Sequence, residues 1–105
     1  MESAALLQLI GGGETSRVQF KENIANPLSA AQELVAFANT EGGQIIVGVA
    51  DKTGAITGLS FEDIQRISSL LVNAASEGVK PPLTIKTESV EISGKKVLVV
   101  TVPSG

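Results

Sequence analysis

An almost unbroken apolar strand directly after a pair of glycines is the feature that most limits how this chain can fold. Gly42 and Gly43 end a predicted helix, and the run from Gln44 to Ala50 that follows is nearly all apolar. Such a run is typical of a strand covered on both faces, because a strand with one wet face alternates apolar and polar residues. The glycines themselves fit a helix stop, with an anion-contacting turn at Asn39, Thr40 and Gly42 as the functional alternative.

A second two-sided element is predicted near the C-terminus, where Ser93-Gly94 is a tight-turn signal between two extended runs, residues 83–92 and 95–102. A two-residue loop fixes how the runs pair: Ile92 with Lys95, Val90 with Val97, Glu88 with Val99 and Ile85 with Val102. Both faces of this hairpin are partly apolar. Three short helices hardly suffice to cover both, so we expect one face to meet a second copy of the chain.

The other segments complete an α+β pattern of about four to five strands with two to three helices. Helices are predicted over residues 2–10, from Pro27 to the glycine pair, and from Ser60 to Gly78. Asn26 and Ser60 are the residue types that cap helix N-termini. Strands are predicted over residues 17–21 and, as a short return, 56–59.

Composition excludes several classes of protein. The chain has 105 residues, 43% of them hydrophobic, with no His and no Cys. It can bury one core but not two, so residues 1–105 form a single domain. Without Cys or His it offers no disulfide framework, no thiol or imidazole metal site and no His-based triad. No membrane span or signal sequence is apparent, so we expect a cytoplasmic protein that contacts no membrane.

Charge is distributed unevenly, although the net charge is only −3. From Val79 onward four lysines face two glutamates, so this stretch is net +2. Four basic residues could form an edge that contacts nucleic-acid phosphates: Arg17, Lys21, Lys95 and Lys96. Phosphate contacts position a protein without reading sequence. Stacking of bases on aromatic rings is not expected, because all three Phe residues (Phe20, Phe37 and Phe61) lie in apolar patterns.

Two catalytic possibilities are weaker. The segment Gly11-Gly12-Gly13-Glu14-Thr15 lacks the Lys of a phosphate-binding loop, so we expect no nucleotide cofactor. Glu14, Glu22 and Asp51 lie at predicted strand edges and could hold a divalent metal for phosphodiester cleavage. Carboxylates are common on protein surfaces, so solvated surface charges explain these three residues better than a metal site does.

Three motifs together resemble the Schlafen/Alba-like DNA-binding domain family. The first is Glu14-Thr15-Ser16-Arg17-Val18-Gln19-Phe20-Lys21, which is similar to E-x-x-x-x-E-F-K. The second is Ala36-Phe37-Ala38-Asn39-Thr40-Glu41-Gly42-Gly43, and the third runs from Ile45 through Gly48-Val49-Ala50-Asp51 to Ile56-Thr57-Gly58. The resemblance is dense over residues 14–58 and implies an Alba-like mixed sheet.

The resemblance also implies a function. Bacterial members of the family are typically the front part of transcriptional regulators or RecG-related proteins, so we expect the N-terminal fragment of a longer protein. The implied role is nucleic-acid binding, with DNA favoured over RNA. The two-sided hairpin, and not the resemblance, is the reason to expect a homo-oligomer, and we expect no cofactor. An oligomerisation or sensory domain is the alternative.

Animal Schlafen relatives cleave RNA with an acidic trio, onto which Glu14 and Asp51 can be carried over. Gln19 stands where the family pattern has its second Glu, and an amide cannot supply an anionic ligand. We therefore expect no enzymatic activity, with a metal-dependent nuclease as the second alternative.

Overall fold

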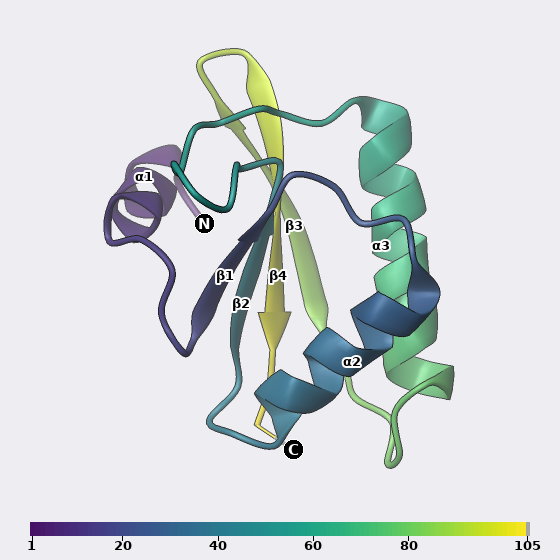
Figure 1. The fold of residues 1–105 in the computed structure, drawn as a ribbon. Coiled ribbons are helices and arrows are strands. Elements are labelled where there is room, and N and C mark those ends of the chain that lie inside the picture. Colours follow the sequence, from purple (N-terminus) through teal and green to yellow (C-terminus); the bar gives the residue numbers. More distant parts are fainter. Residues whose placement is uncertain (105) are drawn as a thin grey trace.

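Seven helices and strands make up the fold in the computed structural model, which describes residues 1–104 (Figure 1). In chain order they are α1 (Ser3–Gly11), β1 (Val18–Lys21), α2 (Pro27–Ala38), β2 (Gly43–Val47), α3 (Phe61–Glu77), β3 (Lys86–Ile92) and β4 (Lys95–Val102). Three helices and one four-stranded sheet within these residues confirm the predicted α+β class. No helix among them is long and apolar enough to cross a membrane.

The sheet is mixed, with the strand order β1-β2-β4-β3. β1 and β2 run parallel, as expected for two strands joined through a helix, whereas β4 is antiparallel to both of its neighbours. The hairpin register confirms the prediction, with Ile92 opposite Lys95 and Val90 opposite Val97.

Two predicted strands were wrong in extent. β3 begins at Lys86 rather than Leu83, and no pairing of Ile85 with Val102 forms. The Leu83 amide instead donates to the Ala75 carbonyl of α3, at 2.9 Å. Residues 56–59 form two isolated bridges and no strand. Gly58 interrupts this segment with φ +79°, a left-handed conformation that breaks an extended chain.

Helices of the same chain cover both faces of the sheet (Figure 1). α2 and α3 pack on one face, where Leu34, Ile67 and Leu71 meet strand residues such as Ile45 and Val100. α1 covers the other face. There its buried residues Leu6 and Ile10 pack with Phe20, Ile46, Val97 and Val99.

The inference that three helices would leave one hairpin face for a second copy was therefore wrong. Val90, Val97 and Val99 are each no more than 6% exposed within a single chain. α1 is short, but its buried residues Leu6 and Ile10 pack in one cluster with the apolar residues of that face. The hairpin therefore gives no reason to expect a homo-oligomer, which stays an untested prediction.

Local signals place the helix starts as expected. The Asn26 side chain accepts hydrogen bonds from the amides of Leu28 and Ser29, at 2.8 and 3.4 Å, ahead of Pro27. The Ser60 hydroxyl accepts from the Asp63 amide at 3.0 Å. These side chains satisfy amide groups that have no partner inside the helix.

Candidate nucleic-acid interface

The four basic residues predicted to contact phosphates lie at two ends of the sheet. Lys21 is the last residue of β1 and pairs in register with Val47 of β2, which in turn pairs with Leu98 of β4. Lys96 lies two residues before Leu98 in β4. From the usual strand spacing and rise, the Cα atoms of Lys21 and Lys96 are about 12 Å apart. Arg17 precedes β1 at the opposite end, roughly 20 Å from Lys96 on the same reckoning. The structure does not bring Arg17 together with the lysines.

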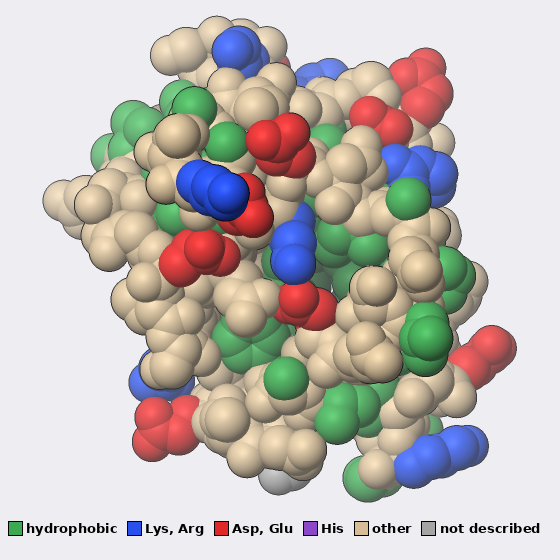
Figure 2. Space-filling view, in the orientation of Figure 1, with side chains coloured by type: hydrophobic (Ala, Val, Ile, Leu, Met, Phe, Trp, Pro, Cys, Tyr) green, Lys and Arg blue, Asp and Glu red, His purple; other side chains and the backbone are tan. Residues whose placement is uncertain are grey.

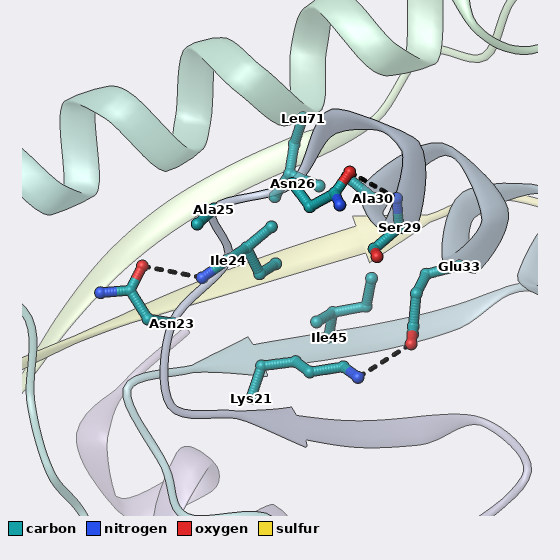
Figure 3. Close-up of a pocket in the computed structure, with 10 residues that line it drawn as sticks. All are labelled: Lys21, Asn23, Ile24, Ala25, Asn26, Ser29, Ala30, Glu33, Ile45 and Leu71. Atoms are coloured by element: carbon teal, nitrogen blue, oxygen red, sulfur yellow. Dashed lines mark hydrogen bonds and ion pairs between the residues drawn. The ribbon is translucent and has the colours of Figure 1, made fainter.

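Arg17 and Lys21 are each engaged by a carboxylate. Arg17 lies 3.5 Å from the Glu41 carboxylate and also donates to the Glu41 carbonyl at 3.4 Å. The Lys21 ammonium lies 2.9 Å from the Glu33 carboxylate of α2 (Figure 3). The Arg17–Glu41 pair is exposed and contributes little to stability, whereas the Lys21–Glu33 pair is half-buried. In both cases a phosphate group must displace the carboxylate before the cation can bind it.

Lys95 and Lys96 form no ion pair within residues 1–104. Lys95 Nζ donates to the Ile56 carbonyl at 3.1 Å, and Lys96 Nζ lies 5.7 Å from the centre of the Phe61 ring. Both lysines line an open groove of about 390 Å³ between the hairpin turn and the loop of residues 57–61. We call this hollow the hairpin groove.

The lining of the hairpin groove contains two lysines and no carboxylate. Four other hollows of the described chain each include at least one carboxylate. These are Glu33 beside Lys21, Glu77 between α2 and α3, the pair Glu14 and Asp51, and Glu41 beside Arg17. The groove also lies at the N-terminus of α3, where the helix dipole favours an anion.

Acidic side chains surround the groove without lining it. Glu62 and Asp63 lie in the first turn of α3, and Glu91 of β3 is directly opposite Lys96. On the face shown in Figure 2, basic and acidic side chains are interspersed and no continuous basic surface forms. Any attraction for phosphate is therefore local to the groove.

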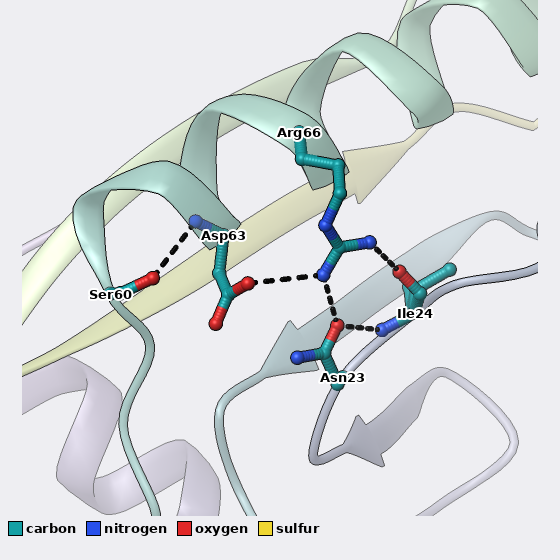
Figure 4. Close-up of polar contacts among 5 residues, drawn as sticks. All are labelled: Asn23, Ile24, Ser60, Asp63 and Arg66. Atoms are coloured by element: carbon teal, nitrogen blue, oxygen red, sulfur yellow. Dashed lines mark hydrogen bonds and ion pairs between the residues drawn. The ribbon is translucent and has the colours of Figure 1, made fainter.

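Arg66 links α3 to the loop that follows β1 (Figure 4). Its guanidinium donates to the Ile24 carbonyl at 2.6 Å, to the Asn23 side chain at 2.7 Å and to Asp63 at 3.2 Å. The hydrogen bond from Arg66 is the main cause that lowers the pKa of Asp63 below its ordinary value, assisted by Ser60. Arg66 thus compensates one of the two acidic residues in the first turn of α3.

Comparison with known proteins assigns the family. Residues 14–105 match the family described as Schlafen, AlbA_2. The chain belongs to the Schlafen/AlbA_2 family. This membership confirms the resemblance inferred from the three motifs, and it fits a domain associated with nucleic acids.

Two solved structures share the Schlafen/AlbA_2 fold seen here. The first is the solution structure of the N-terminal domain of an ATP-dependent DNA helicase RecG-related protein from Nitrosomonas europaea, with a TM-score of 0.76 and 23% identity. The match covers 100% of this chain and 74% of that one. The second is the crystal structure of the DIP2311 protein from Corynebacterium diphtheriae, with a TM-score of 0.59 and 23% identity. It covers 97% of this chain and 25% of that one.

The acidic trio of Schlafen nucleases is not assembled in this family member. Glu14 and Asp51 line one hollow, where Glu14 accepts from the Phe20 amide at 3.0 Å. The Gln19 amide contacts Glu33 on the α2 side of the sheet instead, once its oxygen and nitrogen are assigned to satisfy both groups. Within residues 1–104, no three acidic side chains are grouped so as to hold a metal ion. The residues present do not fit the three-carboxylate site.

Phe61 is the groove residue that the sequence analysis missed. It was assigned to an apolar core pattern, but its side chain is 58% exposed and lines the hairpin groove. Leu59 and Ile64, on either side of the Ser60 cap, pack on the α2–α3 core instead. Those two positions form the usual apolar contact across a helix start, and this pattern could have shown that Phe61 is not needed there.

Proposed function

We propose that this chain is a DNA-binding module of a prokaryotic transcriptional regulator that holds the phosphate backbone without reading base sequence. The observation that carries the proposal is the hairpin groove, where Lys95 and Lys96 stand together with no carboxylate in the lining. Neither ammonium group has an ion-pair partner within residues 1–104, so a phosphate oxygen need not displace a carboxylate to reach it. Lys95 can keep its hydrogen bond to the Ile56 carbonyl, because an ammonium group has three N–H donors. Membership of the Schlafen/AlbA_2 family supports the same conclusion.

The role of each predicted residue follows from its position. Lys95 and Lys96 make the primary contacts, because they share one groove. Lys21 joins them only when a phosphate displaces Glu33. Arg17 contacts phosphate only on a ligand long enough to span the sheet, since it lies at the opposite end.

Binding is tested by fluorescence anisotropy of a labelled duplex DNA titrated with the protein at several salt concentrations. The double variant Lys95→Gln with Lys96→Gln is expected to weaken binding and to reduce the slope of log K against log salt by about 1.8, as for two lost phosphate contacts. The matched control is Lys80→Gln with Lys86→Gln, which removes the same charge from exposed residues beyond α3 and at the start of β3. Equal losses in the two double variants would refute the assignment to the groove.

We propose that the chain binds nucleic acid and does not cleave it. Gln19 contributes an amide where the acidic trio requires a carboxylate, and that amide faces Glu33 across the sheet from Glu14. Incubation of the labelled duplex, or of transfer RNA, with the protein and manganese should leave the nucleic acid intact. Appearance of cleavage products that vanish in Glu14→Gln would establish the nuclease alternative.

An oligomerisation or sensory domain is the second candidate. Leu28 of α2 is 67% exposed at the mouth of a hollow of about 510 Å³, which lies between α2 and α3 and is also lined by Ala31 and Leu70. An exposed apolar side chain beside an apolar hollow favours contact with another molecule. Sedimentation velocity over a range of concentrations tests it, and a monomer throughout would count against self-association.

A further inference from the structure

Phe61 is a large aromatic side chain that the fold does not need where it stands. It is the first residue of α3, exposed by 58%, and it belongs to neither of the two core clusters. Leu59 and Ile64 already supply the apolar contact that fixes the start of the helix. Because more than half of Phe61 is exposed and it joins neither core cluster, we look for its role in what it faces.

The ring faces Lys96, one of the two lysines that carry the proposed function. Lys96 Nζ lies 5.7 Å from the ring centre, within the distance at which a cation and an aromatic face attract each other. Lys95 lines the same groove, and Gly58 and Gly94 keep side-chain bulk out of its walls. A flat aromatic surface therefore stands beside two cations in one hollow.

This combination is the one that binds single-stranded nucleic acid. Proteins that hold single strands pair cationic side chains for the backbone with aromatic rings on which unpaired bases stack. The Lys96 ammonium lies over the ring, so a base that stacks on that face must displace it. The flexible lysine stem then allows the ammonium to contact the phosphate of the same nucleotide. The groove volume of about 390 Å³ falls in the range of about 300–1,000 Å³ typical of small-ligand sites.

We propose that the hairpin groove binds an unpaired nucleotide of a single strand, with the base on Phe61 and the phosphates on Lys95 and Lys96. This inference rests on the proposed function and specifies its ligand. In a duplex both faces of each base are covered by stacking neighbours, so the ring gains nothing from it. The protein should accordingly hold a single strand more tightly than a duplex of the same length.

Acidic side chains beside the hairpin groove disfavour a second nucleic-acid backbone there. Glu62 follows Phe61 directly, Glu91 lies opposite Lys96, and Asp63 is held by Arg66. Their charges repel a second backbone beside the groove, which disfavours a duplex further. A single strand presents one backbone and can keep it on the lysine side.

The test compares a labelled short thymidine strand with a duplex of equal length at low salt. Phe61→Leu keeps an apolar side chain but removes the ring, and it should weaken binding of the strand by about tenfold while leaving the duplex unchanged. Val72→Ala is the control, because Val72 is also an exposed apolar residue of α3, at 47%, and does not line the groove.

A second readout uses the absence of Trp and Tyr from the chain. Phe61→Trp places a single emitter in the groove, and stacking of a base on the indole should quench its emission as the strand saturates the protein. Affinity for the strand should be retained in this variant, because a larger ring also stacks.

The outcomes separate the two proposals. If Lys95→Gln with Lys96→Gln abolishes binding of strand and duplex while Phe61→Leu changes neither, the phosphate site stands and the stacking inference is overturned. Unchanged emission of Phe61→Trp at saturation overturns it as well. If neither the strand nor the duplex binds at low salt, the proposed function itself fails and the stacking inference falls with it.

Discussion

Replacing Gly43 by Ala should destabilise the fold strongly, although the position lies in a strand and has no left-handed backbone. An added Cβ would lie 2.5 and 2.7 Å from two ring carbons of Phe37 and closer still to the Arg17 carbonyl. Phe37 is 4% exposed, and the Arg17 carbonyl accepts the Gln44 amide at 2.8 Å. Either the ring leaves its place in the core or β1 moves away from β2.

The magnitude follows from these two neighbours. Overpacking of a core costs about 1–3 kcal/mol, and a backbone neighbour that cannot rotate away places Gly43→Ala at the upper end. The stiffer unfolded chain offsets about 0.4–1 kcal/mol, which leaves a net loss of about 2 kcal/mol. For a domain of this size that corresponds to a fall in Tm of about 10 °C.

Urea unfolding followed by circular dichroism measures this loss. With an m-value of about 1.5 kcal/mol/M, the midpoint should fall by about 1.3 M. Gly11→Ala is the matched control: its added Cβ meets no atom within 4 Å, and Ala favours the end of α1, so the midpoint should hold or rise. A midpoint for Gly43→Ala equal to that of the wild type would refute the packing argument. If Gly43→Ala kept the wild-type midpoint but lost DNA binding, the result would support the alternative that the glycine pair belongs to an anion-contacting turn.

Two further predictions concern charges around the groove. Glu91→Gln should tighten binding of a short thymidine strand about threefold at low salt, because it removes the carboxylate opposite Lys96. The control Glu77→Gln removes a carboxylate of α3 that lies away from the groove, and it should leave the affinity unchanged. Equal gains in the two variants would point to net charge alone. Asp63→Asn should lose stability at neutral pH, because the lowered pKa of Asp63 means that its carboxylate is more stable in the folded state. That contribution is present above the unfolded pKa and disappears as the pH falls below about 4, so the wild type and the variant should converge there in urea unfolding.

Features specified by a few neighbouring residues could be predicted from the sequence, and features specified by distant residues could not. The hairpin register follows from Ser93-Gly94 alone, and the helix starts follow from Asn26 and Ser60. The pairing of β2 with β4 joins Gly43 to Val102, and no local pattern encodes contacts over such a separation. Residues 56–59 look like a strand by apolar content, but the positive φ of Gly58 decides otherwise.

The candidate site, too, could be predicted only where neighbouring residues specify it. The residue types that bind phosphate are visible in the sequence, and Lys95 and Lys96 are adjacent in it. Which lysines remain without an ion pair depends on α2, since Glu33 engages Lys21 across the sheet surface. The exposure of Phe61 likewise depends on tertiary packing: Leu59 and Ile64 pack on the core, whereas Phe61, which the sequence analysis placed in an apolar pattern, stays exposed.

The net negative charge of the chain does not decide whether the hairpin groove can bind a phosphate, because only nearby charges act on a ligand there. At about 0.1 M salt, charges farther than about 10 Å from a phosphate are largely screened. The potential in the hairpin groove is therefore set by Lys95 and Lys96 against Glu62 and Glu91, because Arg66 compensates Asp63. Formal charges in this set cancel, and the advantage of the lysines is that they line the groove while the carboxylates do not. A binding site built this way is short-ranged and depends strongly on direct contact with the ligand. An aromatic contact such as Phe61, which salt does not screen, then contributes a larger share of the affinity as the salt concentration rises.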